Sequence, residues 1–131
     1  MGNTIIQLER VNKSYHLGKV EVPALKNVSL GIHAGEFTAL IGASGSGKST
    51  LLNMIGCIDQ PESGQIWIDG VDVLSLSDDK KSDLRNQKIG FIFQSFNLVP
   101  VLSVFENVEL PLLINPLISK AERTQRVLEA I

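Results

Sequence analysis

A run of glycine and serine between two apolar segments constrains this chain more than any other feature. Residues 42–49, GASGSGKS, fit the pattern G-x-x-x-x-G-K-[ST]. The apolar residues 37–41 before the run predict a strand that is buried on both faces. After the run, the spacing of the apolar residues over Lys48 to Ile58 predicts a helix. A strand, a glycine-rich turn and a helix in this order are typical of a loop that binds phosphate.

The residue types of the run suit a polyphosphate. Glycine tolerates the positive φ angles that turn successive backbone N–H groups inward, and the first N–H groups of the helix lack intrahelical partners. Lys48 adds a full charge within reach of the β- and γ-phosphates, and Ser49 offers a hydroxyl to Mg²⁺. The predicted phosphate-binding residues are Gly42, Ala43, Ser44, Gly45, Ser46, Gly47, Lys48, Ser49 and Thr50. A glycine-rich turn without a ligand is the alternative.

Alternation and capping patterns predict the other elements of an α/β fold. Strands are expected over residues 5–11, 28–32 and 88–93, with a shorter strand and its turn in QIWIDG. Ser77 is a candidate N-cap for a polar helix that reaches about residue 86. Two capping boxes, Ser103 with Glu106 and Ser119 with Glu122, predict two further helices, the first of them interrupted at Pro111.

Composition narrows the class of protein and of partner. The chain has 131 residues, of which 44% are hydrophobic, and this length suits one core rather than two. A net charge of −2 provides no overall basic field that would attract nucleic acid. The single cysteine, Cys57, excludes an internal disulfide, and we expect a small buried side chain there rather than a nucleophile. Neither a signal peptide nor a membrane-spanning run is evident.

Two long segments resemble the ATP-binding subunit of ABC transporters. The segment from VNKSYHL to QIWIDG resembles the opening of that family's domain, and IGFIFQSFNLVPVLSVFENVELPLL resembles its Q-loop and the residues that follow. VFENVELPL is most similar to the subgroup that serves lipoprotein release and macrolide export. The resemblance implies a P-loop NTPase with a RecA-like core and an N-terminal antiparallel β subdomain. Residues 1–131 would be the N-terminal part of one such domain, with its helical subdomain starting near residue 103.

The resemblance also implies ligands and roles for individual residues. ATP and Mg²⁺ are the expected ligands, with Tyr15 stacking on adenine. Gln94 would contact Mg²⁺ and the attacking water, so that Lys48 and Gln94 are the catalytic candidates and Ser49 and Gln94 the metal ligands. Packing is the alternative role for Tyr15, and capping of a loop is the alternative for Gln94.

The family also implies partners and a location. Phe96, Leu98 and Val99 are candidates for a surface that grips the membrane-spanning subunit, with burial in a core as the alternative. A second ATP-binding subunit would complete the site. The protein would lie in the cytoplasm, against the inner face of the membrane.

Several family motifs do not occur in these 131 residues. We find no LSGGQ-type signature, no apolar run followed by Asp-Glu after Gln94, and no late histidine, since His16 and His33 both precede the loop. We therefore expect the chain to bind nucleotide with Mg²⁺ weakly and not to turn ATP over. The last predicted helix has no closing residue, which indicates a cut or, alternatively, a frayed end.

The sequence is also compatible with two other classes of protein. A small P-loop kinase would need an arginine-rich lid, for which Arg123 and Arg126 are the candidates, and a non-enzymatic nucleotide-binding module is a further alternative. Asp78, Asp79 and Asp83 are expected to form a solvated face rather than a metal cluster. A strand at 37–41 without neighbours would favour self-association or an unstable monomer.

Overall fold

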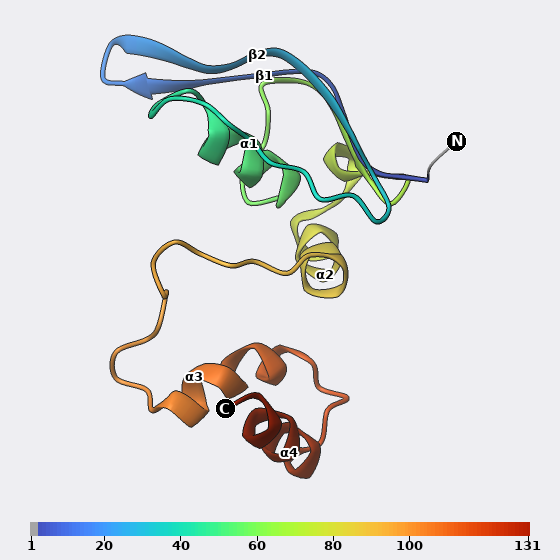
Figure 1. Cartoon of the computed structure of the whole chain (residues 1–131), viewed down its shortest axis with the longest axis vertical. Helices are drawn as coiled ribbons and strands as arrows, with labels where there is room; N and C mark the ends of the chain where they lie inside the picture. The colour runs from blue at the N-terminus through green and yellow to red at the C-terminus, as the bar shows by residue number, and fades with distance from the viewer. Residues whose placement is uncertain (1–2) are drawn as a thin grey trace. The chain divides into compact units, whose positions relative to one another are not determined.

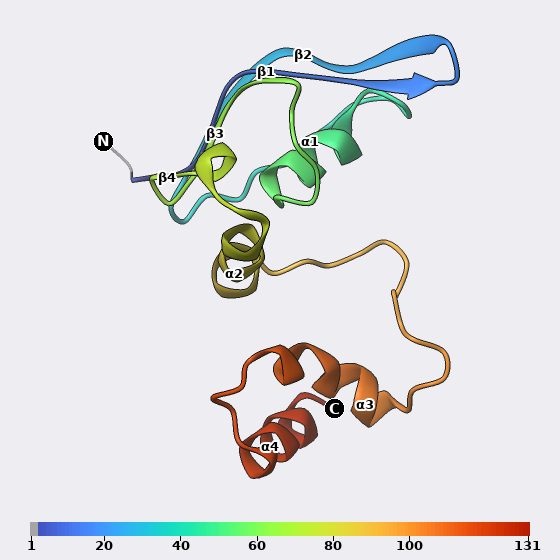
Figure 2. The same ribbon diagram turned by 180° about the vertical axis from the view of Figure 1, so that it is seen from behind.

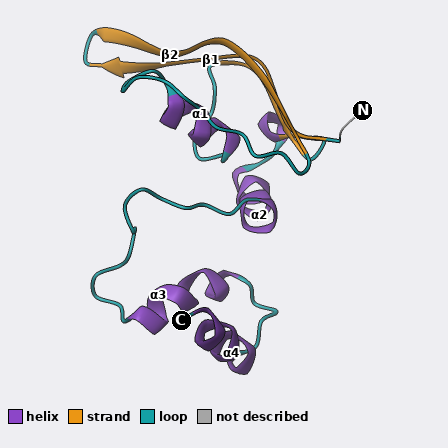
Figure 3. Ribbon diagram, viewed as in Figure 1, coloured by secondary structure: helices purple, strands orange, loops and turns teal. Residues whose placement is uncertain are grey.

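The computed structural model describes residues 3–131, which form two units. The first unit, Met1–Phe91, contains the whole β-sheet, whereas the second unit, Ile92–Ile131, is built from helices and loops (Figures 1 and 3). No helix among the described residues combines the length and the apolar character that a bilayer crossing needs. The prediction that residues 1–131 belong to a single domain stays a prediction.

The sheet of the first unit is antiparallel throughout. It consists of β1 (Thr4–Leu17), β2 (Val20–His33), β3 (Ser63–Ile68) and β4 (Val71–Asp72), in the order β2-β1-β3-β4. Leu8 of β1 lies opposite Leu30 of β2 on one side and opposite Ile66 of β3 on the other. The strands predicted at 5–11 and 28–32 are confirmed, and both extend into a long hairpin that sequence alternation alone did not reveal.

Two α-helices contribute side chains to the hydrophobic core of the first unit. Helix α1 (Lys48–Ile55) lies along the β1–β2 hairpin (Figure 2). Helix α2 (Asp78–Lys88), which follows the short 3-10 helix η1 (Val73–Ser75), adds Leu84 to the cluster. Full burial of such side chains contributes about 1.5–3 kcal/mol each. The buried members are Leu8, Val11, Leu25, Met54, Cys57, Ile66, Ile68 and Val73.

Helix α1 ends earlier than the sequence predicts. The predicted helix reached Ile58, but the observed one ends at Ile55 because Cys57 adopts a left-handed conformation with φ of 54°. The Cys57 N–H donates to the Met54 carbonyl at 3.1 Å, and the Ile58 N–H donates to the Asn53 carbonyl at 2.9 Å. This is the Schellman arrangement, with cysteine at the position that usually holds glycine. Gly56, the C-cap, directly follows the last helical residue and is the stop signal in the sequence, one position before the left-handed Cys57.

Two of the predicted strands are wrong. Residues 37–41 and 88–93 are not strands in the structure, and the sheet of residues 3–131 contains β1 to β4 alone. The side chains of Phe37 and Ile41 are 99% and 95% exposed. A strand requires a neighbour that supplies ladder hydrogen bonds, and the apolar pattern specifies a buried face but not that neighbour.

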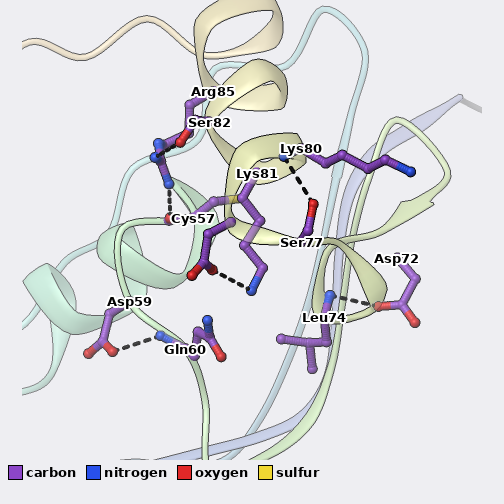
Figure 4. Close-up of polar contacts among 11 residues, drawn as sticks. Cys57, Asp59, Gln60, Asp72, Leu74, Ser77, Lys80, Lys81, Ser82 and Arg85 are labelled. Carbon is purple, nitrogen blue, oxygen red and sulfur yellow. Dashed lines mark hydrogen bonds and ion pairs between the residues drawn. The ribbon is translucent and has the colours of Figure 1, made fainter.

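The predicted helix caps are largely confirmed. Ser77 accepts a hydrogen bond from the Lys80 N–H at the start of α2 (Figure 4). In the second unit, Ser103 and Glu106 form a complete capping box before α3 (Val104–Glu109). Pro111 lies in the 3-10 helix η2 (Leu110–Ile114), which continues α3.

The last helix, α4 (Lys120–Ala130), is capped by Ser119, which accepts from the Glu122 N–H at 3.2 Å. The Glu122 carboxylate forms an ion pair with Arg126 along the helix. Of the second predicted capping box, the hydrogen bond to the Ser119 side chain is therefore present. Within and just after α4, Val127 is buried, whereas Leu128 and Ile131 are exposed.

Candidate nucleotide-binding site

The glycine-rich run forms an exposed loop that leads directly into α1. Gly45 and Gly47 have φ angles of 76° and 88°, which is the left-handed region that favours glycine. Gly47 is the N-cap of α1 and provides no side chain that could bond to the first N–H groups of the helix. Those N–H groups and the positive end of the helix dipole are therefore available to an anion.

Gly47 also permits a close approach between the loop and the sheet. A Cβ atom at this position would lie 2.4 Å from the carbonyl oxygen of Ala24 in β2. A Cβ atom on Gly42 would lie 2.7 Å from Ser46 Oγ, across the loop. The glycines thus serve the packing of the loop as well as its curvature.

Lys48 folds its side chain back over the loop. Its Nζ donates to the carbonyl oxygens of Gly42 at 2.9 Å and Ala43 at 2.7 Å, and it lies 3.4 Å from Ser46 Oγ. These bonds hold the ammonium group over the curl of the backbone. An arriving phosphate can exchange for them, because an ionised acceptor binds an ammonium group more strongly than a neutral carbonyl does.

Two hollows border the loop, and they differ in the residues that line them. The larger, of about 490 Å³, lies between β2 and the loop and is lined in part by Leu40, Ile41 and Leu51. The smaller, of about 250 Å³, is lined by Tyr15 together with Ser49 and Thr50. Because only the smaller hollow combines the aromatic ring with both hydroxyls, it is the better candidate for a nucleotide.

Tyr15 therefore lies beside the glycine-rich loop, although the two are far apart in sequence. The β1–β2 hairpin carries it there, since Tyr15 lies opposite Val22 and both residues line the smaller hollow. Tyr15 is 38% exposed, and its hydroxyl donates to Asp59 Oδ2 at 2.9 Å. An exposed ring that is held at its hydroxyl end can stack on a flat base.

Sequence reasoning missed two residues of this site, Lys13 and Asp59. Lys13 Nζ lies 2.8 Å from Asp59 Oδ1 and 5.3 Å from the centre of the Tyr15 ring. The only sequence signal was the two-residue spacing of Lys13 and Tyr15, which places both on one face because β1 extends to Leu17, beyond the predicted strand. Nothing in the sequence connected Asp59 to them.

Three of the open alternatives can be compared with the structure. Cys57 is buried, and this burial raises the pKa of its thiol against the opposing charges of Arg85 and Lys81, which does not suit a nucleophile. Arg123 pairs with Glu109, and Arg126 pairs with Glu122, so these arginines have structural partners. Residues 78, 79 and 83 are exposed, and no metal-binding group of three or more His, Cys, Asp or Glu residues occurs within residues 3–131.

The remaining candidates belong to the second unit, whereas the loop belongs to the first. Gln94 is exposed there, as are Phe96, Leu98 and Val99. Exposure does not fit the alternative that these three apolar residues are buried in a core. The roles predicted for Gln94 and for this apolar segment stay predictions.

Comparison with known proteins identifies the family. The family model for the ABC transporter matches residues 25–131, which include the loop, α1 and the whole second unit. The chain belongs to the ABC transporter family.

Curated relatives of this ABC transporter chain are about half identical to it. An ABC transporter ATP-binding protein of Bacillus subtilis, YvrO, is 50% identical over 127 residues, which cover 97% of this chain and 55% of that protein. The macrolide export ATP-binding/permease protein MacB of Syntrophobacter fumaroxidans is 51% identical over 108 residues, covering 82% of this chain and 15% of the relative. The chain thus spans about half the length of the ATP-binding proteins that it matches.

A solved structure shows the same fold. The ATP-binding cassette MJ0796 of Methanocaldococcus jannaschii, in a dimeric post-hydrolysis state bound to ADP and Pi, matches with a TM-score of 0.86 and 48% identity. The match covers 95% of this chain and 54% of that one. The fold predicted from sequence, the beginning of a P-loop NTPase with an antiparallel subdomain, is confirmed.

Proposed function

We propose that this chain binds ATP through residues 42–50 and Tyr15, and that the complete protein hydrolyses ATP to drive export across a membrane. The observation that carries the proposal is the loop itself. Two left-handed glycines open an uncapped helix, and the Lys48 ammonium lies over the loop's carbonyl oxygens. In this arrangement the Lys48 ammonium can attract the negative charge of a triphosphate, and the backbone N–H groups can donate hydrogen bonds to its oxygens.

The donor set at the start of α1 fits Mg²⁺. Ser49, the second residue of α1, is exposed and lines the smaller hollow, so that its hydroxyl would hold the ion beside the phosphates. Gln94 is the second proposed ligand, on the strength of the family resemblance. The bound ion would neutralise charge that develops on the phosphates, while Lys48 and the loop orient them.

Hydrolysis and transport are proposed for the complete protein. The relatives named for macrolide export and for pyoverdine export support export as the direction, and the dimeric cassette structures support pairing with a second ATP-binding subunit. Phe96, Leu98 and Val99 would contact the membrane-spanning subunit at the cytoplasmic face of the membrane. Because these 131 residues contain no signature motif and no Asp-Glu pair after Gln94, we expect them to bind ATP without turning it over.

Calorimetric titration tests the proposed function directly. The protein is titrated with ATP in the presence of Mg²⁺, and Lys48→Ala is expected to weaken binding at least tenfold, because a charge-assisted contact to phosphate is lost. Lys80→Ala, which removes an exposed charge from α2, is the matched control and should bind like the unmodified protein. The proposal fails if folded protein releases no heat with ATP or ADP, or if both variants bind alike.

A further inference from the structure

Two charged side chains hold Tyr15 beside the loop. Asp59 accepts a hydrogen bond on each of its carboxylate oxygens, from Lys13 Nζ at 2.8 Å and from the Tyr15 hydroxyl at 2.9 Å. Lys13 also donates to the carbonyl oxygen of Gln60 at 2.7 Å and lies over the Tyr15 ring. The tyrosine is thus restrained at its hydroxyl by a carboxylate and at its ring by an ammonium group.

The fold fixes the position of Asp59 as well. Asp59 follows the left-handed turn that ends α1, and the Arg85 guanidinium of α2 donates to the Cys57 carbonyl within that turn at 2.7 Å (Figure 4). The Asp59 carboxylate also accepts from the Gln60 N–H at 2.7 Å (Figure 4). The loop that carries Asp59 is therefore tied to both helices of the first unit.

The ion pair between Lys13 and Asp59 is partly shielded from solvent, which strengthens the attraction between the two charges. The side chains of Lys13 and Asp59 are 14% and 30% exposed. Partial burial alone would raise the pKa of the Asp59 carboxyl, but the hydrogen bonds from Lys13, the Gln60 N–H and Tyr15, with the charge of Lys13, hold it below its ordinary value. Asp59 is therefore ionised at neutral pH and accepts both side-chain bonds.

We propose that Lys13 and Asp59 are positioning residues that set the distance between the base and the phosphates of a bound nucleotide. The inference rests on the proposed function. Helix α1 starts at the phosphate-binding loop and ends just before the Asp59 turn, so one rigid element of about 12 Å relates the two ends of the ligand. A ring that is already fixed loses less conformational freedom on stacking, which corresponds to about two- to tenfold in affinity.

The decisive measurement compares a ligand that has a base with one that lacks it. The protein is titrated with ATP and, separately, with inorganic tripolyphosphate, each in the presence of Mg²⁺. We expect Lys13→Met to weaken ATP binding about two- to tenfold and to change tripolyphosphate binding less than twofold. Lys88→Met, which breaks the Lys88–Asp69 ion pair of 2.7 Å elsewhere in the first unit, is the matched control and should change neither.

A double-mutant cycle shows whether Lys13 acts through the ring. In a Tyr15→Ala background, Lys13→Met should cause no further loss of ATP affinity, since the residue that it positions is absent. Tyr15→Phe keeps the Lys13–Asp59 ion pair and removes only the phenol bond, and it should weaken ATP binding in the same direction. This variant serves as the test if Lys13→Met does not fold.

Tyr15 is the only tyrosine of the chain, so selective labelling gives one ring signal in an NMR spectrum. Lys13→Met should shift that signal in the ligand-free protein, and Lys88→Met should leave it in place. Equal losses for ATP and tripolyphosphate, an undiminished Lys13→Met effect in Tyr15→Ala, or an unmoved ring signal would each overturn the inference. An unmodified protein that binds tripolyphosphate and ATP equally well would overturn it while leaving the phosphate site intact, whereas failure to bind either would remove the proposed function itself.

Discussion

Among single residues, Gly47 is constrained both by its backbone conformation and by its neighbours. Its φ angle of 88° and its approach to the Ala24 carbonyl both require the absence of a Cβ atom. The spacing pattern alone predicted that glycine is needed there for backbone curvature. The contact with β2 is a second reason, which depends on how the hairpin lies over the loop.

Gly47→Ala should therefore lower the free energy of unfolding by more than the cost of placing an alanine in a left-handed conformation. The conformation costs an alanine about 1–2 kcal/mol, and the clash of 2.4 Å with a backbone oxygen in a sheet adds to that cost. Gly18→Ala at the hairpin turn is the control, because its φ is 63° and no atom lies within 4 Å of the added Cβ. Urea denaturation should show a larger loss for Gly47→Ala, and equal losses would contradict the close approach.

At the scale of elements, caps decide where helices begin. Ser103 and Glu106 exchange side-chain bonds with each other's backbone, as a serine followed three residues later by glutamate predicts. Asn107 reinforces this end of α3, since its amide group bonds to the backbone of Val99, Leu102 and Ser103. The end of α1 departs from the usual pattern, because Gly56 is the C-cap and the left-handed position after it holds Cys57.

The capping box makes the start of α3 sensitive to acid. Hydrogen bonds from the side chain and the backbone of Ser103 lower the pKa of the Glu106 carboxyl below its ordinary value. Their contribution to folding is complete above the unfolded pKa of about 4.3 and is lost as the pH falls through the lower folded pKa. A carbon-13 NMR titration should place the Glu106 midpoint higher in Ser103→Ala. Ser119→Ala, which removes the cap of α4, should leave that midpoint unchanged, and identical midpoints in all three proteins would refute the role of the box.

Across the whole molecule, the apolar segment 37–41 departs most from what its sequence predicts. The segment was expected to be a strand buried on both faces, yet it lies outside the sheet and exposes Phe37 and Ile41. Side chains of this size and exposure favour association through the hydrophobic effect.

We accordingly expect the 131-residue chain to self-associate through this segment. Light scattering should show an apparent mass that rises with protein concentration, and Phe37→Asp should reduce the rise because a charge opposes burial. Leu17→Asp is the matched control, since Leu17 is 70% exposed at the tip of the hairpin in the same unit. A compact monomer at every concentration, or an equal effect of both substitutions, would count against the prediction.

Features that depend only on neighbouring residues could be predicted from the amino-acid pattern. The glycine-rich loop, the Ser77 and Ser103 caps and the interruption at Pro111 each require a few adjacent residue types, because torsion angles and first-turn hydrogen bonds are local. The other features depend on long-range packing. Packing places Lys13 and Tyr15 against Asp59, and residues 37–41 lie outside the sheet. Such contacts join segments that are distant in the chain, and a pattern of polar and apolar residues names no partner.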